Sequence, residues 1–329
     1  NLSEWLGMGD WRLYFLHRDR IENVNTADVQ RVAEQYLTRN NRTAGRFIPT
    51  KTPQRVEIPQ VTDVAAMLEG YQGKAQIAQG ENFEPSFDNI DQRTKELSLS
   101  NGAKVSLLAK KTRGESVSVS INLRLGSEAS LHGLNDVSTA VGSMLMRGTA
   151  EYTRTQLQDE FDKLKAQVHF GAWSTGAFTR ITTTKENLPA VLDLATSVFK
   201  EPRFDQEEFA QFKATRKVDI EQNQQDPQRL AFREYSRKQS QFSAGHPYYQ
   251  ATFEEELANL SALKISQLKD FHQNFYGMNS AQISIVGDFN EGKITKQLEK
   301  LYGNWTAKES HVLIKNDFKK MPVKDVEFN

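Results

Sequence analysis

Residues 133–149 read GLNDVSTAVGSMLMRGT, and the apolar residues of this stretch recur with the period of an α-helix. The apolar positions are Leu134, Val137, Val141, Met144 and Leu145. Gly148 follows them, and glycine is the residue type that most readily takes the positive φ angles found just after a helix. The stretch therefore predicts a helix with one buried face that ends at Gly148.

Strands are predicted on the N-terminal side of this helix. Asn101-Gly102 lies between two short apolar runs, and an Asn-Gly pair favours the tight turn of a β-hairpin. Apolar and polar residues then alternate strictly from Val117 to Leu125, which is typical of a strand with one face on a core and the other towards solvent.

Both kinds of element are predicted on the C-terminal side. Thr155 and Gln158 have the spacing of a helical capping box. Strand patterns follow at 168–172 and 178–184, and helices at about 187–200, 205–225 and 227–240. Such a succession of strands and helices predicts the α+β class.

A helix-to-strand unit occurs twice. The helix expected at 25–39, capped by Asn25 or Thr26, is followed by a strand pattern at 44–48. The helix around 268–276 is followed by a strand at 281–286, and its apolar spacing is the same at an offset of 239 residues (268 − 29). Chance similarity stays open, because amphipathic helices followed by strands are common. A lone helix and strand cannot bury their own apolar face, however, which favours the tail of a truncated, equivalent domain.

The amino-acid composition argues against several classes of function. Lys plus Arg and Asp plus Glu both number 42, so a zero formal net charge argues against nucleic acid as a partner. The absence of cysteine excludes disulfides, thiol nucleophiles and Cys-ligated zinc. No apolar run reaches the roughly 20 residues of a membrane-spanning helix, so we expect no membrane-spanning segment.

The stretch 133–149 resembles the inverted zinc-binding helix of the insulinase and pitrilysin metallopeptidases, in which His-x-x-Glu-His precedes a basic residue and Gly-Thr. Arg147, Gly148 and Thr149 match that ending. Further similarity lies in GMGDWRLYFLHRDRIENV (7–24), LSNGAKVSLLAKKTRG (99–114) and FYGMNSAQISIVGDFN (275–290). The resemblance implies an insulinase-like α+β domain, with a mainly antiparallel sheet packed against helices, preceded by the tail of an equivalent domain.

The three positions that correspond to the zinc motif have lost its chemistry. They are Thr139, Gly142 and Ser143, which offer two hydroxyls and no side chain where the motif has two imidazoles and a carboxylate. We therefore expect no metal site and no catalytic residue in this chain. Family members carry two related halves, of which typically only the first keeps the motif, so zinc is expected in a missing N-terminal half.

Other side chains give weaker signals. The family resemblance implies that Tyr249, with Tyr248, helps to hold substrate, although the Arg expected nearby has no match close in sequence; Arg237 is the nearest candidate upstream. Both tyrosines could instead pack at a domain edge beside a turn at Pro247. Gly287-Asp288 lacks the further glycines and lysine of a phosphate loop, which favours a strand-to-helix turn.

The resemblance and the patterns together predict four segments. Residues 1–50 are the C-terminal helix and strand of a truncated domain, 51–95 a proline-containing linker, 96–306 a complete peptidase-like domain, and 307–329 a linker or the start of a further domain.

The first functional hypothesis is a non-catalytic half of a zinc metalloendopeptidase that forms part of the peptide-binding chamber, with the N-terminal half of the same polypeptide and a peptide substrate as partners. The alternative is a non-peptidase scaffold or binding subunit that retains the peptidase fold. An intact His-x-x-Glu-His upstream of Asn1 would separate the two. Exported bacterial relatives favour the periplasm, with the cytoplasm as the alternative location.

Overall fold

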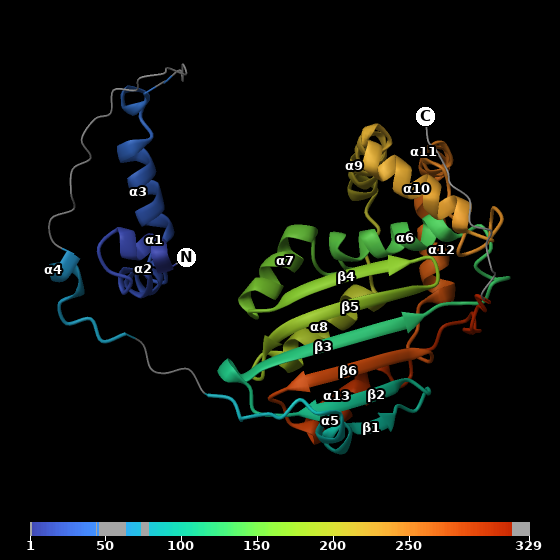
Figure 1. Ribbon diagram of the computed structural model, residues 1–329, viewed down its shortest axis with the longest axis horizontal. Helices are drawn as coiled ribbons and strands as arrows, with labels where there is room; N and C mark the ends of the chain where they lie inside the picture. The colour runs from blue at the N-terminus through green and yellow to red at the C-terminus, as the bar shows by residue number, and fades with distance from the viewer. Residues whose placement is uncertain (1, 44, 46–63, 74–78, 318–329) are drawn as a thin grey trace. The chain divides into compact units, whose positions relative to one another are not determined.

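The computed structural model describes residues 2–43, 45, 64–73 and 79–317. The chain forms two compact units, Asn1–Gln76 and Ile77–Asn329 (Figure 1). The segment limits expected at residues 50, 95 and 306 stay predictions.

The first unit is helical in its described part. Its elements are α1 (Leu2–Gly7), α2 (Leu13–Ile21), α3 (Thr26–Tyr36), the 3₁₀ turn η1 (Arg39–Asn41) and α4 (Val64–Leu68). Asn25 caps α3 in a capping box with Asp28, which confirms the predicted helix start. Tyr71 Oη donates a hydrogen bond of 2.7 Å to Asp19 in α2. The strand predicted at 44–48 lies outside the described residues, apart from Gly45.

The second unit is built on one six-stranded sheet with the order β1-β2-β6-β3-β5-β4 (Figure 1). The strands are β1 (Lys95–Ser98), β2 (Lys104–Ala109), β3 (Ser116–Arg124), β4 (Gln167–Trp173), β5 (Gly176–Thr184) and β6 (Ala281–Gly287). Only β2 and β6 pair in parallel, and the other pairs are antiparallel. The predicted α+β class and mainly antiparallel sheet are confirmed.

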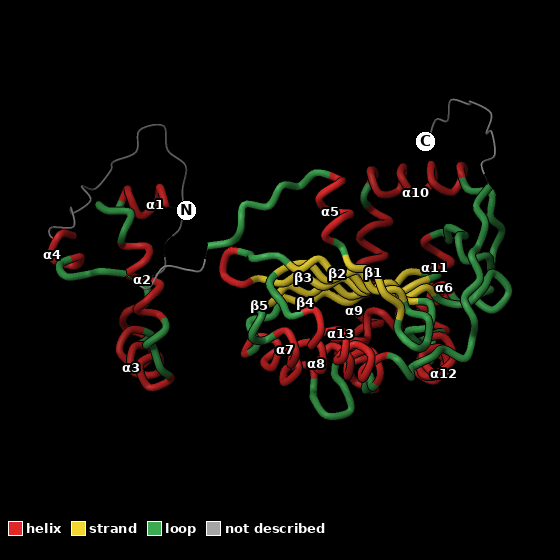
Figure 2. The backbone as a smooth tube through the Cα atoms, turned by 90° about the horizontal axis from the view of Figure 1, so that it is seen from below, coloured by secondary structure: helices red, strands yellow, loops and turns green. Residues whose placement is uncertain are grey.

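Helices surround this sheet. They are α5 (Phe87–Arg93), α6 (Asn135–Met144), α7 (Arg154–Lys163), α8 (Leu188–Lys200), α9 (Gln206–Gln225), α10 (Pro227–Gln239), α11 (Phe253–Ala262), α12 (Ile265–Phe275) and α13 (Glu291–Tyr302), with 3₁₀ turns η2 (Arg113–Glu115) and η3 (Leu145–Arg147). Figure 2 shows α7, α8, α12 and α13 on one face of the sheet. Across the described ranges, no helix has the length and apolar character needed to cross a membrane.

One local prediction needs adjustment. The capping box of α7 is formed by Thr153 and Gln156, two residues before the predicted pair Thr155 and Gln158. Thr153 forms a bridge with Gly148, which holds it in the extended conformation that a helix cap requires. The prediction that residues 51–95 form a linker stays a prediction; α4 and α5 lie within this segment, and Arg93 of α5 donates a hydrogen bond of 2.9 Å to Ala109 O in β2.

The face of the sheet opposite α7, α8, α12 and α13 is polar, because polar residues occupy alternate strand positions. The strand register aligns them in rows, of which one contains Glu96, Ser106, Ser284, Ser120, Arg180 and His169. The intervening residues, such as Val105, Ile121 and Ile283, are buried. We refer to this polar side of the sheet as its open face.

Candidate functional site

Helix α6 carries the positions that correspond to the zinc motif. Thr139 and Ser143 lie on its exposed side, whereas Gly142 is buried. The Thr139 hydroxyl donates to Asn135 O and the Ser143 hydroxyl to Thr139 O, each over 3.0 Å. Both hydroxyls are therefore engaged with the helix backbone one turn earlier.

Gly142 allows α6 to approach the end strand β4 closely. A Cβ atom at this position would lie 2.4 Å from both the Cβ and the main-chain nitrogen of Ala172. One turn earlier, the Ser138 hydroxyl donates a hydrogen bond of 2.8 Å to Trp173 O. The helix is thus fixed against β4 at a distance that only glycine permits at position 142.

Two adjoining hollows lie along the exposed side of α6. The larger, of about 710 Å³, is bounded by the first turn of α6, the end of β4, residues 244–251 and α11. The smaller, of about 350 Å³, lies between α6, α9 and α11. Both are lined by Asp136, Thr139, Arg216 and Glu256, and we call them together the α6 groove.

The predicted tyrosines and Thr139 all line the larger hollow of this groove. The Tyr249 hydroxyl donates to the Glu255 carboxylate over 3.0 Å, and the main-chain N–H of Tyr248 donates to His246 Nδ1 over 3.0 Å. Both residues are half-buried, so the packing role and the binding role left open by the sequence are compatible.

Arg237 lies beside Tyr249, although the two residues are far apart in the sequence. The pKa of Arg237 is held above its ordinary value chiefly by its hydrogen bond with Glu234, over 2.9 Å, and Tyr249 contributes in the same direction. The fold thus places an arginine next to the tyrosine, although 12 positions separate Arg237 from Tyr249 in the sequence (249 − 237).

Acidic groups predominate in the groove. Glu256 forms ion pairs with Arg216 over 3.4 Å and with Arg233 over 2.9 Å. Asp136 instead accepts a hydrogen bond of 2.7 Å from the neutral amide of Asn259. Burial raises the pKa of Asp136 above its ordinary value, and nearby Glu256 acts in the same direction.

Comparison with known proteins identifies the family to which these elements belong. The model described as "Insulinase (Peptidase family M16)" matches residues 105–250, which include α6 and both tyrosines, and the model "Peptidase M16 inactive domain" matches residues 262–329. The chain belongs to the insulinase family.

Individual relatives of this insulinase-family chain are distant. An uncharacterized zinc protease of Bacillus subtilis is 23% identical over 217 residues, which cover 65% of this chain and 51% of the relative. The mitochondrial-processing peptidase subunit beta of Dictyostelium discoideum is 22% identical, with 67% of this chain and 46% of the relative covered. The chain therefore spans about half the length of the curated relatives that it matches.

Solved structures share the fold. The peptidase M16 inactive domain from Pseudomonas fluorescens superposes with a TM-score of 0.58 at 20% identity, and a protease from Helicobacter pylori with a TM-score of 0.56 at 15% identity. Each similarity covers 68% of this chain and 53% of the other.

The residues at the insulinase motif positions do not fit a zinc ion. Zinc sites use imidazole, thiolate or carboxylate ligands, whereas Thr139 and Ser143 present hydroxyls already bonded to their own helix and Gly142 presents no side chain. In the part of the chain that the structure describes, no three His, Asp or Glu side chains are grouped so as to hold a metal ion.

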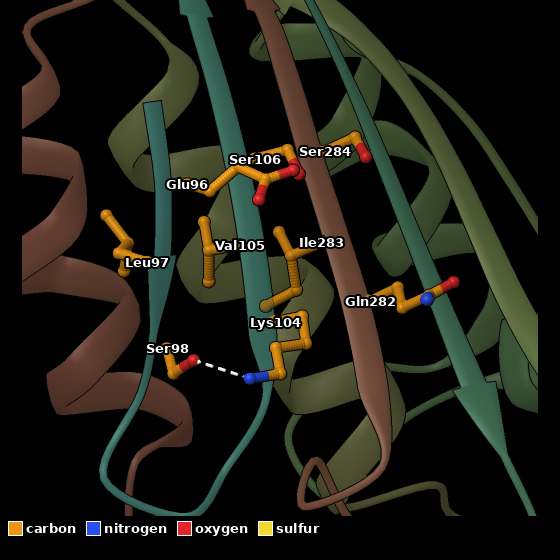
Figure 3. A pocket seen from close by; sticks show the side chains of 9 residues that line it. All are labelled: Glu96, Leu97, Ser98, Lys104, Val105, Ser106, Gln282, Ile283 and Ser284. Atoms are coloured by element: carbon orange, nitrogen blue, oxygen red, sulfur yellow. Dashed lines mark hydrogen bonds between the residues drawn. The ribbon is translucent and has the colours of Figure 1, made fainter. Parts of the chain in front are cut away.

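A third hollow, of about 480 Å³, lies on the open face where β1, β2 and β6 run side by side (Figure 3). Its polar lining comes from Glu96, Ser98, Lys104, Ser106, Gln282 and Ser284. Lys104 Nζ donates a hydrogen bond of 3.0 Å to the Ser98 hydroxyl, drawn as a dashed line in Figure 3. These groups can donate and accept hydrogen bonds.

Asp288, in the predicted strand-to-helix turn after β6, has a structural environment. Its side chain is 7% exposed and lies 3.1 Å from Lys111 Nζ and 2.9 Å from Lys185 Nζ. The hydrogen bond from Lys185 chiefly lowers the pKa of this carboxyl. The turn therefore joins β6 to the segments after β2 and β5.

Sequence reasoning missed the charged groups of the α6 groove. Asp136, Arg216 and Glu256 come from α6, α9 and α11, and no local motif contains all three. A capping-box pattern at Thr252 and Glu255 marks the start of α11, but it gives no sign that Glu255 also receives the hydroxyl of Tyr249.

Proposed function

We propose that this chain is the non-catalytic half of a zinc-dependent metalloendopeptidase, in which it forms part of the chamber that holds peptide. The hydrolytic centre belongs to the N-terminal half of the same polypeptide. The match to an inactive-domain model and the names of the relatives, which include zinc proteases, support this assignment. A periplasmic location stays a prediction.

The observation that carries the proposal is the state of α6. The helix packs beside β4 and is followed by Arg147-Gly148-Thr149, the residues that match the ending of the family motif. Its motif positions have been replaced by residues that bond within the helix or pack against Ala172. A well-packed helix without metal ligands is the expected result when the fold remains useful and the metal chemistry is supplied elsewhere.

The open face and the outer edge of β4 provide surfaces suited to peptide. The open face presents hydroxyl, amide and charged side chains in aligned rows. Strand β4 is the last strand of the sheet, and an end strand can pair with an extended chain through its main-chain groups. A chamber wall of this kind binds unfolded segments without requiring one sequence.

A chelator experiment on the intact protein tests the assignment. We expect the protein that contains this chain and its upstream half to cleave an unfolded peptide, to lose cleavage with a zinc chelator and to regain it when zinc is added back. Cleavage that does not depend on metal would contradict the proposal. Absence of cleavage by the intact protein would favour a scaffold or binding subunit.

A substitution series tests the state of α6 in this chain. Gly142→Glu should lower the free energy of unfolding by about 1–3 kcal/mol, because the new side chain has no room beside Ala172. Ser143→Glu, on the exposed side, should change it by less than about 0.5 kcal/mol. The triple change Thr139→His, Gly142→Glu and Ser143→His should not bind zinc stoichiometrically. A stable triple variant with one zinc per chain in elemental analysis would contradict this account.

A further inference from the structure

The outer edge of β4 lies next to the α6 groove. In the described sheet, β4 pairs with β5 on one side and with no strand on the other. Ala172, Trp173 and Ser174, at the end of β4, form part of the wall of the larger hollow. A peptide that added a strand to this edge would therefore pass along the mouth of the groove.

Strand addition fixes where the side chains of such a peptide point. Alternate residues of a strand face opposite sides of the sheet. One set would face the α6 groove, and the other set would face the open face beside the exposed rings of His169 and Trp173. Both rings pack against Phe178, with centroid distances of 5.4 and 5.9 Å. The two sides of the edge thus offer different chemistry.

The groove side carries more acidic than basic side chains. Asp136, Glu255 and Glu256 line the larger hollow, together with the single cation Arg216. Glu256 is shared between Arg216 and Arg233. Asp136 and Glu255 accept hydrogen bonds from neutral donors, the Asn259 amide, the Tyr249 hydroxyl and the Thr252 main-chain N–H. Within the described ranges, neither carboxylate forms an ion pair of its own.

We propose that the α6 groove and the edge of β4 form a binding site in this chain for an extended peptide that places a lysine or arginine side chain between Asp136 and Glu255. The main-chain groups of the peptide form hydrogen bonds with β4. Its basic side chain forms ion pairs with the two carboxylates, whose hydrogen-bond donors in the described structure are neutral. The proposal deepens the proposed function, because it gives the non-catalytic half its own selectivity for substrate segments.

Binding to the isolated chain tests the site without any catalytic step. The probe is a fluorescent peptide of about ten residues in extended, non-helical sequence, with one central arginine, and fluorescence anisotropy gives its dissociation constant. We expect replacement of this arginine by glutamine to weaken binding about tenfold. Methylation of alternate peptide nitrogens on the paired side should abolish binding, because it removes donors to the strand edge.

Variants of the chain provide matched controls. Asp136→Asn and Glu255→Gln each remove one negative charge and keep hydrogen-bonding capacity, and each should weaken binding of the arginine peptide about five- to tenfold. Glu96→Gln removes the same charge at the opposite end of the sheet, in the hollow of Figure 3, and should leave binding unchanged. Circular dichroism checks that each variant is folded.

Several outcomes would overturn the proposal. These are equal binding of the arginine and glutamine peptides, full binding after methylation, or self-association of the chain through β4 in place of peptide binding. The result is separable from the proposed function. An intact protein that cleaves peptide while this chain binds none would reject only the groove, whereas a chain that binds peptide within a non-cleaving protein would reject only the peptidase assignment.

Discussion

Helices α3 and α12 have the same length, the same spacing of apolar residues and the same offset at both ends, yet their surroundings differ. In α12, Leu268 is 0% exposed and Phe271 is 3% exposed. Their counterparts Val29 and Val32 in α3 are 59% and 43% exposed. The pattern of the sequence defines an apolar face in both helices; among the described residues, a sheet and helices cover this face in α12, whereas in α3 it is exposed within the first unit.

This difference shows that amphipathic spacing predicts which face of a helix is apolar. The spacing does not indicate whether the same chain contains the surface that covers this face. An exposed row of large apolar residues along one helix is uncommon in a stable surface and marks an interface. The proposed upstream half would supply a sheet for α3, as the second unit does for α12. The following predictions challenge this comparison, starting with the largest effect.

Truncation of one apolar side chain in each helix gives the largest contrast. Leu268→Ala should lower the free energy of unfolding by about 2–5 kcal/mol, because it opens a cavity in a packed core. Val29→Ala should change it by less than about 0.5 kcal/mol in this chain, because the side chain is mostly exposed. Chemical denaturation measures both, with one probe in the second unit for Leu268→Ala and one in the first unit for Val29→Ala.

Equal losses from the two substitutions would contradict the comparison, since they would mean that α3 is already covered. A sharper version repeats Val29→Ala in the protein that includes the upstream half. There we expect a loss of about 0.5–1.5 kcal/mol, because the side chain would then lie in an interface core.

Ala33 of α3 corresponds to His272 of α12. Because only the histidine of this pair titrates, the stability of the folded chain should depend on pH through this position in α12 and not in α3. His272 Nε2 lies 2.7 Å from Phe199 O, and burial lowers the pKa of the imidazole below its ordinary value of 6.5. Below pH 6.5 the unfolded chain takes up a proton that the folded chain does not accept until its lower pKa is reached. Stability should therefore be full above pH 6.5 and fall as the pH decreases.

His272→Gln keeps a donor for the Phe199 carbonyl and removes the titrating ring. It should make stability less dependent on pH below 6.5, at a cost of about 1–2 kcal/mol at pH 8 through lost packing. Ala33→His places a histidine on the half-exposed face of α3 and should not add to this dependence. An unchanged pH profile in His272→Gln would show that other groups cause the acid instability.

Much of the fold is predictable because the determining signals are local. The alternation from Val117 to Leu125 and the helical spacing before Gly148 correspond to β3 and α6. The parallel pairing of β2 with β6 is not local, since it joins Val105 to Ile283 across most of the unit. Periodicity indicates which face of each strand is buried, but it contains no information on which strand lies beside it.

The site is less predictable than the fold. Motif positions Thr139, Gly142 and Ser143 follow from the sequence, but the reason for glycine at 142 is its distance from Ala172, which only the folded structure reveals. The groove carboxylates come from separate helices, so their shared environment also depends on tertiary packing. Two overlapping Thr-x-x-Gln pairs could cap α7. The bridge between Gly148 and Thr153 favours Thr153 as the cap, and this contact also lies outside the local pattern.

The smallest effect is expected at the residue after each helix. Tyr276 is 2% exposed, its hydroxyl has no hydrogen-bond partner in the described structure, and burial raises its pKa above the ordinary value of 10.0. A buried hydroxyl without a partner costs free energy, so Tyr276→Phe should stabilise the chain by about 1 kcal/mol at pH 7. Above pH 10 the gain should grow, because the unfolded chain ionises its tyrosine before the folded chain does.

The equivalent residue in the first unit, Leu37, is 84% exposed and supplies the control. Leu37→Tyr and Leu37→Phe should have equal stability at pH 7, because a hydroxyl at that position stays in water whether or not the chain is folded. Thermal unfolding of the four proteins gives both differences. A loss of stability in Tyr276→Phe would show that the hydroxyl is satisfied in solution, and the two helix ends would then differ in hydrogen bonding as well as in burial.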